Sequence, residues 1–244
     1  MYGIRSTCRA AAILIFICLA ATGALAQGIG VTPTNVLLGP GQDAAALSIT
    51  NRSDRKISFQ IRGYSWRQTG AEGEDVLDPT ADLVSSPPIA TIQPGASQVV
   101  RLVLRQSGRT AEKTFRIIFD QLPSANPSEE VHVLIRLSIP VFAQPEAKVA
   151  PRVHWRITNE GARSWLSAFN EGNRHLTVHD MKIQDEAGRV LQLDIRSPPH
   201  ILAGASRRWR IVTNAPLARD KAVRLTAGAD LGSIDERIVP DAGP

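Results

Sequence analysis

Short apolar segments that end at turn residues follow one another along almost the whole chain, and this pattern constrains the fold more than any other feature. Residues 57–62, for example, read ISFQIR, in which three apolar residues alternate with three polar ones. Such alternation is typical of a strand with one buried face. No segment places apolar residues at helical spacing between helix caps. The sequence therefore predicts an all-β protein built from sandwiches of the immunoglobulin-like kind.

The strand pattern is interrupted once, at residues 142–155, which read FAQPEAKVAPRVHW. This break predicts a first β-sandwich over residues 27–143, a linker over 144–150 and a second β-sandwich over 151–240. In the second half, EAGR at 186–189 predicts a hairpin in which Gly188 takes a positive φ. We expect four tryptophans in or over these sandwiches: Trp66 in the first, and Trp155, Trp165 and Trp209 in the core of the second.

The start of the chain has the organisation of an export signal. Arg5 and Arg9 precede an apolar stretch over residues 11–21, and Ala-Leu-Ala follows at 24–26. Residues 1–26 are therefore predicted to be a cleavable signal peptide, and a retained N-terminal anchor is the alternative. Both cysteines of the chain, Cys8 and Cys18, lie in this segment, so the exported part holds together without disulfides.

Charge and motifs give little support to an enzyme or a nucleic-acid-binding protein. The formal net charge of +5 falls to +3 once the two signal arginines are removed, and no basic run stands out. The exported part has no phosphate-binding glycine loop, no G-x-S-x-G motif and no cysteine nucleophile. We expect no catalytic residue, no cofactor, no nucleotide and no nucleic-acid partner.

His175 and His179 are the one histidine pair close in sequence. Four residues apart on a strand, they share a face but stand about 13 Å apart, which is too far for one metal ion. The remaining histidines are isolated, so we expect no metal site.

Residues 131–141, VHVLIRLSIPV, form the most unusual segment. One face of the predicted strand carries an unbroken apolar row, consisting of Val131, Val133, Ile135, Leu137 and Ile139. If this row faces the core of its own domain, it needs no further explanation. If it faces outward at a sheet edge, it can complete the sheet of another protein.

Several stretches together resemble a known family. They are ITNRSDRKISFQIRGYSW at 49–66, SSPPIATIQPGASQVVRLVLR at 85–105, FRIIFDQLP at 115–123 and VLIRLSIPVFAQP at 133–145. In these residues the chain resembles the PapD-like periplasmic chaperones of chaperone–usher pili, and within them the archaic branch related to spore-coat U subunits. The likeness is strong through Phe142 and weak beyond Ala150.

The resemblance implies a fold, a location and partners. Two immunoglobulin-like sandwiches would form an L with a cleft between them, in the periplasm. The chaperone would lend the strand at 131–141 to a pilus subunit that lacks its own last strand, and deliver the subunit to an outer-membrane usher. Val131, Val133, Ile135, Leu137 and Ile139 would then fill the groove of the subunit. The free protein could also associate with itself through the exposed strand edge.

The basic residues that anchor the C-terminal carboxylate of the subunit in this family are absent here. Their positions correspond to Asn35 and Pro140, and neither residue carries a charge. Arg116 is the first candidate substitute, because the strand at 114–122 should run antiparallel to the lent strand and bring Arg116 beside Pro140. Arg136 and Arg101 are the second and third candidates. A guanidinium can bind a carboxylate in a bidentate, charge-assisted manner.

Two other classes of function stay open. An exported adhesin or carbohydrate-binding module with two immunoglobulin-like domains would bury the strand at 131–141 in its own core and carry its function on loops. An exported hydrolase would need acidic residues gathered in a pocket, which the sequence does not reveal.

Overall fold

The computed structural model describes residues 28–105, 108–123, 133–195 and 200–242. The predicted signal peptide and Val131 therefore lie outside the described residues. The described part contains strands and no helix, and so no helix that could cross a membrane. This all-β architecture agrees with the prediction from the strand pattern.

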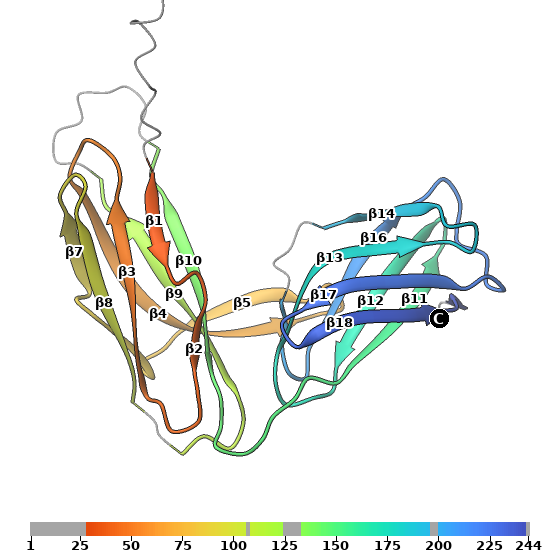
Figure 1. Ribbon diagram of the computed structural model, residues 1–244, viewed down its shortest axis with the longest axis horizontal. Coiled ribbons are helices and arrows are strands. Elements are labelled where there is room, and N and C mark those ends of the chain that lie inside the picture. The colour runs from red at the N-terminus through yellow and green to blue at the C-terminus, as the bar shows by residue number, and fades with distance from the viewer. Residues whose placement is uncertain (1–27, 106–107, 124–132, 196–199, 243–244) are drawn as a thin grey trace, which may run out of the picture.

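Two sheets form the first sandwich, which is the red-to-green half of Figure 1. The first sheet has the order β1-β3-β8-β6, with β1 Ile29–Thr32, β3 Ala44–Asn51, β8 Ser97–Leu104 and β6 Leu83–Ser86. The second has the order β2-β10-β9-β4-β5, with β2 Val36–Leu38, β10 Arg136–Ala143, β9 Lys113–Gln121, β4 Ile57–Thr69 and β5 Glu74–Pro79; β7, Ile89–Ile92, also pairs with β4. The chain thus leaves the first sheet after β1 and joins the second at β2.

The sequence alternation determines which side chains enter the core of this sandwich. In β8, Val100 and Leu102 are fully buried, whereas Val99 and Val103 on the opposite face are about half exposed. From the other sheet, Phe59 and Phe119 meet edge to face with ring centroids 6.3 Å apart. Burying one such aliphatic or aromatic side chain stabilises a fold by about 1.5–3 kcal/mol, so an interior of this size holds the domain together without a disulfide.

The second sandwich contains the strands that follow residue 152. Its strand order is β18-β17-β13-β14-β16-β12-β11-β19, and β15 also pairs with β13. The bounds are β11 Val153–Glu160, β12 Arg163–Asn170, β13 Leu176–Gln184, β14 Val190–Asp194, β15 His200–Ile201, β16 Ser206–Val212, β17 Val223–Ala229, β18 Gly232–Ile238 and β19 Asp241–Ala242. Gly188 has φ 77° in the turn between β13 and β14, as the sequence predicts. No strand crosses residues 144–150, the predicted linker.

The tryptophans are only partly where the sequence places them. Trp209 is fully buried in the second core, and Trp155 packs on it with ring centroids 5.9 Å apart. The expectation for Trp165 is wrong, because this residue lies on the opposite face of the sheet, under the guanidinium of Arg208 at 4.2 Å. Trp66 faces away from the first core and belongs to a cluster with Leu202 of the second sandwich.

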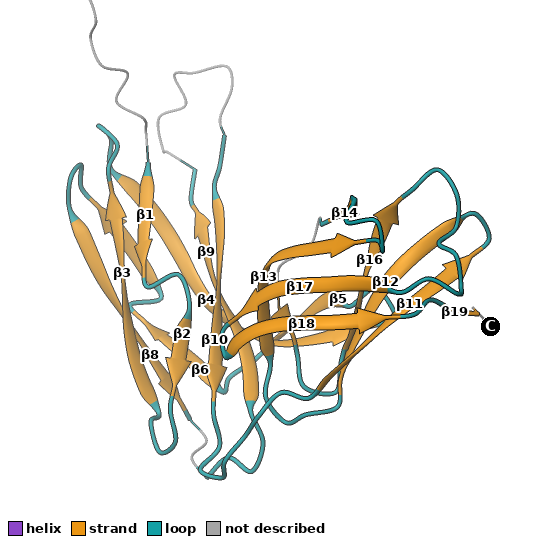
Figure 2. Cartoon of the chain, turned by 45° about the vertical axis from the view of Figure 1, so that its right-hand side comes forward, coloured by secondary structure: helices purple, strands orange, loops and turns teal. Residues whose placement is uncertain are grey.

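The two sandwiches stand at an angle to each other, and the long β4–β5 hairpin extends from the first toward the second (Figures 1 and 2). The tip of this hairpin fits closely against β16: a side chain at Gly73 would place its Cβ 2.4 Å from the carbonyl oxygen of Ser206. Gln68 of β4 accepts a hydrogen bond from the backbone N–H of Leu202 and donates one to the carbonyl of His200. The hairpin therefore ties the two domains together on the inner side of the angle.

Candidate functional site

Strand β10 lies at the inner corner of the angle and has an open edge. On one side it pairs with β9 over its whole length, from Arg136 to Ala143. On the other side it pairs with β2 only at Val141–Ala143. In the described part of the chain, no strand pairs with that side of residues 136–140. This stretch of edge can therefore accept another strand.

The apolar row along this segment divides into an exposed and a buried half. Val133 is 79% exposed and Ile135 is 36% exposed, whereas Leu137 packs partly against the core and Ile139 is only 7% exposed. The strand itself begins at Arg136 rather than at residue 131. The prediction that the whole row faces outward is thus wrong for Ile139, because the odd-numbered side chains of β10 point into the sandwich and Ile139 packs in its core.

The segment before β10 combines exposed apolar side chains with a fixed backbone. Leu134 is 49% exposed, so three consecutive apolar residues at 133–135 face solvent. The backbone of Ile135 donates to the side-chain oxygen of Gln121 and accepts from its N–H. Gln121 ends β9, and so it holds the segment in line with the sheet.

Arg116 lies directly opposite Pro140 in the β9–β10 ladder, as the sequence predicts. Its guanidinium is 3.8 Å from the ring centroid of Trp66 and 3.6 Å from a carboxylate oxygen of Asp75. Burial lowers the pKa of Arg116, the charge of Arg207 lowers it further, and Asp75 opposes both. In the described residues Arg116 has this ion pair and this ring contact but no hydrogen bond, so its N–H donors are not committed.

The two other candidate anchors occupy different positions. Arg136 is exposed at the start of β10, where both it and Arg62 of β4 donate to the carboxylate of Asp120. Arg101 is not a candidate, which corrects the third choice made from sequence. It lies on β8, on the outer face of the other sheet, and its ladder partners are Ala46 and Ser86.

Asn35, the position where the family carries its other anchor, lies exposed just before β2. Since Val36 pairs with Val141, Asn35 comes next to Pro140 on the open side of β10. The end of the open edge is thus surrounded by Asn35, Pro140 and Arg116. The family resemblance places Asn35 and Pro140 at this point, and the antiparallel pairing of β9 with β10 brings Arg116 beside them.

Sequence reasoning missed the residues that the second domain brings to this corner. His175 and His200 are 2% and 8% exposed, and Arg207 is 1% exposed. Arg207 donates to the carbonyl of Gly73 at 2.9 Å and to Asp75 at 3.0 Å. Asp75 therefore lies between two buried arginines, one from each domain. No signal in the sequence links residues 75, 116 and 207, because the contact exists only once the domains are together.

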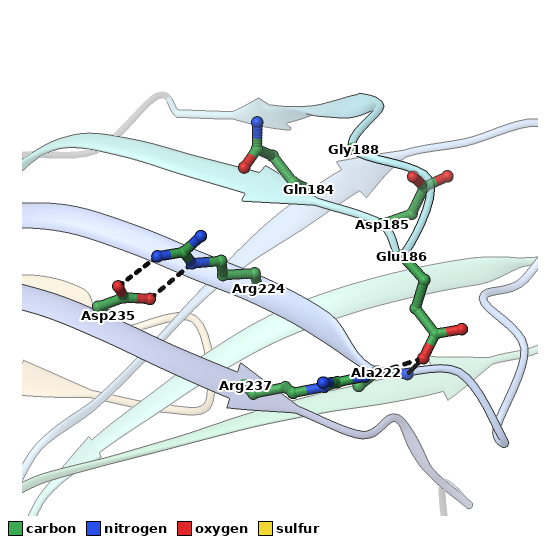
Figure 3. A pocket seen from close by; sticks show the side chains of 8 residues that line it. All are labelled: Gln184, Asp185, Glu186, Gly188, Ala222, Arg224, Asp235 and Arg237. Carbon is green, nitrogen blue, oxygen red and sulfur yellow. Dashed lines mark hydrogen bonds and ion pairs between the residues drawn. The ribbon is translucent and has the colours of Figure 1, made fainter.

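A pocket of about 640 Å³ on the second domain lies under the turn between β13 and β14 (Figure 3). Its charged side chains pair with one another. Arg224 donates to both oxygens of Asp235, and Arg237 donates to Glu186. These pairs neutralise four of the charged side chains of the pocket, and Asp185 pairs with Arg189. Among the described residues, no group of three or more potential metal ligands comes together.

Comparisons with known proteins identify both the fold and the family. Residues 28–148 match the family model for pili and flagellar-assembly chaperones, PapD N-terminal domain. A search of curated proteins found no match.

Solved structures of similar fold extend over nearly the whole chain. One is a chain of the CsuC–CsuE chaperone–tip adhesion subunit pre-assembly complex from archaic chaperone–usher Csu pili of Acinetobacter baumannii. It is 19% identical in sequence, and the match covers 88% of this chain and 99% of that chain with a TM-score of 0.66. The E. coli chaperone DraB shows 18% identity, coverage of 86% and 98%, and a TM-score of 0.57. A chain from the complex of the Salmonella enterica SafA pilin with the SafB chaperone is 15% identical. The match covers 87% of this chain and 96% of that chain, with a TM-score of 0.58.

Proposed function

Because this chain belongs to the family of PapD-like pilus-assembly chaperones, we propose that it binds pilus subunits by lending them the segment 131–141 as a strand. The observation that supports this most directly is the open edge of β10, which continues into the exposed apolar residues 133–135. An exposed apolar strand edge is normally blunted or covered, since it pairs readily with other chains. Here it is retained at the start of a strand whose other end meets the second domain.

The physical gain from such a complex has two parts. A subunit that lacks a strand exposes unpaired main-chain groups and a hydrophobic groove, and the lent strand satisfies both. Val133 and Ile135 are the described residues with the most apolar surface left to bury in that groove. Complete burial of each is worth about 1.5–3 kcal/mol. Leu137 adds less, because it is already packed in part against its own core.

The division of the row also supports one register for the lent strand. Ile139 and Val141 belong to the core of the chaperone, so the row of alternate side chains passes continuously from that core into the groove of the subunit. A slip by one residue would present Leu134 and Arg136 to the groove instead. The buried half of the row therefore holds the lent half in one register.

We place the C-terminal carboxylate of the subunit at Arg116. This position is supported by its place opposite Pro140, at the end of the open edge, and by N–H donors that no described residue uses. Asn35 can donate one hydrogen bond to the same carboxylate. Arg136 is the alternative, although its charge is already shared with Asp120.

The family also implies where and with what the protein acts. In this proposal it is exported by residues 1–26, works in the periplasm without a cofactor or nucleotide, and passes its subunits to an outer-membrane usher. It acts as a chaperone and not as an enzyme.

Co-purification with pilus subunits encoded near its gene tests the proposal. The wild-type protein should carry a stoichiometric subunit, and the double variant Val133→Asp/Ile135→Asp should lose it while staying folded. Val99→Asp/Val103→Asp is the matched control, since these valines are also about half exposed but lie on the outer face of the other sheet. Equal subunit recovery with both double variants would refute strand donation.

A further inference from the structure

The contact between the two domains is built from four aromatic rings, two from each domain. Phe142 of β10 stacks on His175 with ring centroids 3.4 Å apart and planes 8° from parallel. Trp66 meets His200 edge to face at 5.6 Å, and Phe142 meets it at 5.5 Å. Both imidazoles are buried at this contact.

The same contact gathers positive charge around His200. Arg116 of β9 and Arg207 of β16 both lie near it and share the single carboxylate of Asp75. His175 is 6.3 Å away, and Glu112 and Asp230 lie beside His175 rather than beside His200. Among the described residues, the other hydrogen-bond partners of His200 are neutral: Thr177 bonds its Nδ1 at 3.0 Å, and Gln68 donates to its carbonyl.

Glu112 makes His175 a different case. Its carboxylate has no exposed surface and accepts from the backbone N–H of His175 while it also contacts the ring Nδ1 at 3.0 Å. His175 therefore has a carboxylate in direct contact with its ring. A proton on His200 meets the charges of Arg116 and Arg207, which Asp75 only partly opposes, so charging His200 costs free energy.

We propose that this contact is an acid-sensitive latch, which holds the two domains together while His200 is neutral and releases them when His200 is protonated. In the open arrangement the imidazole would be solvated and distant from Arg116 on the first domain. Protonation would thus be favoured by opening, and opening by protonation, as linkage requires.

The environment of His200 sets the direction in which pH shifts the equilibrium between closed and open molecules, and the pH range of this shift. Burial, followed by the charges of Arg116, His175 and Arg207, lowers its pKa from 6.5 to about 4. The closed form binds fewer protons than the open form between these values, so it is favoured in full above pH 6.5 and progressively loses that advantage as the pH falls toward 4. A shift of this size changes the ratio of closed to open molecules on the order of a hundredfold.

Distance measurement on the free protein tests the latch, and its outcome does not depend on whether the chain binds pilus subunits. The chain has no cysteine after residue 18, so spin labels at Gln93→Cys and Ser233→Cys mark one exposed site on each domain. Pulsed electron–electron double resonance should give one narrow distribution of the distance between the two labels at pH 7.5. This distribution should broaden to longer distances between pH 6.5 and 4. The imidazole resonance of His200, followed by NMR, should titrate over the same range.

Two variants identify the responsible group. His200→Asn cannot be charged and should keep the narrow distribution down to pH 4, whereas His179→Gln, which removes an exposed histidine of the same domain, should behave like the wild type. An unchanged distance in the wild type at pH 4 would refute the latch. So would a transition that persists in His200→Asn, or one that coincides with the loss of tertiary structure within either domain. If His200→Asn is not folded, a His200 titration that does not follow the change in distance would be sufficient to reject the proposal.

Discussion

The two ends of the segment around β10 differ in what they expose and what they bury. Apolar side chains are exposed at one end, and charged and polar side chains are buried at the other. Before its start, apolar side chains at 133–135 face solvent. At its end, Phe142 lies against two buried histidines and close to a buried pair of arginines. Exposed apolar surface and buried charge each cost free energy in an isolated protein. The first finds no cover within the described part of the chain, and the second is covered by the other domain.

This difference shows how function can be distinguished from architecture within one strand. In the proposed function the exposed end is stabilised by a bound subunit, so changes there should alter binding and leave folding intact. The buried end is satisfied within the chain, so changes there should lower stability first. The predictions below test this contrast, beginning with the largest expected effect.

Removal of the carboxylate between the domains should have the largest effect on stability. In Asp75→Asn, Arg116 and Arg207 stay buried without their shared counter-charge, and the free energy of unfolding should fall by about 3–5 kcal/mol. Urea denaturation measures this. Asp78→Asn is the control, because Asp78 forms an exposed pair with Arg67 and its loss should change stability by less than about 1 kcal/mol. Equal losses of stability in Asp75→Asn and Asp78→Asn would show that the buried ion pairs of Asp75 contribute no more than an exposed pair.

Within the apolar row, truncation should separate the two halves. Ile139→Ala leaves a cavity in the core and should destabilise the free protein by about 2–4 kcal/mol. Ile135→Ala removes a side chain that is already 36% exposed and precedes the strand, so it should cost about 1 kcal/mol or less. Thermal unfolding of the free protein compares the two. If Ile135→Ala costs as much as Ile139→Ala, the row belongs to the core throughout.

Val133→Ala should weaken subunit binding and leave the stability of the free protein almost unchanged. Because Val133 is 79% exposed, its truncation should change the stability of the free protein by less than about 0.5 kcal/mol. It should weaken the subunit complex by about 1–2 kcal/mol, roughly tenfold in Kd, through lost apolar burial. Calorimetric titration with a subunit measures the second quantity. A loss of stability without a loss of affinity would contradict strand donation.

Arg136→Ala should have the smallest effect. The pair with Asp120 is mostly exposed on the arginine side, so its removal should lower stability by about 0.5 kcal/mol, and less at high salt. Burial would raise the pKa of Asp120, but hydrogen bonds from Arg62 and Arg136 outweigh this and lower it. This lowered pKa stabilises the fold above the ordinary Asp pKa, and that contribution is lost as the pH falls through the lowered value. In Arg136→Ala this acid dependence should weaken, because one of the two hydrogen bonds is gone.

The sequence by itself determined the all-β fold and the identity of the apolar row, because both depend on a local two-residue period that each segment carries independently. It also placed Arg116 beside Pro140, since the register of two antiparallel neighbours follows from the order of strands in a known family. It could not show that Ile139 is buried while Val133 is exposed. Both have the same local pattern, and only the packing of Ile139 into the core of the first sandwich separates them.

Only the tertiary structure revealed Asp75, Glu112, His175, His200 and Arg207 as one cluster. These residues are far apart in the chain, and each, taken alone, resembles an ordinary polar surface residue. Their burial, their pairing and the lowered pKa of His200 arise when two separately patterned domains close on each other. Local sequence encodes how a strand alternates. Which surfaces a second domain covers, and which it leaves for a partner, is decided by long-range contacts.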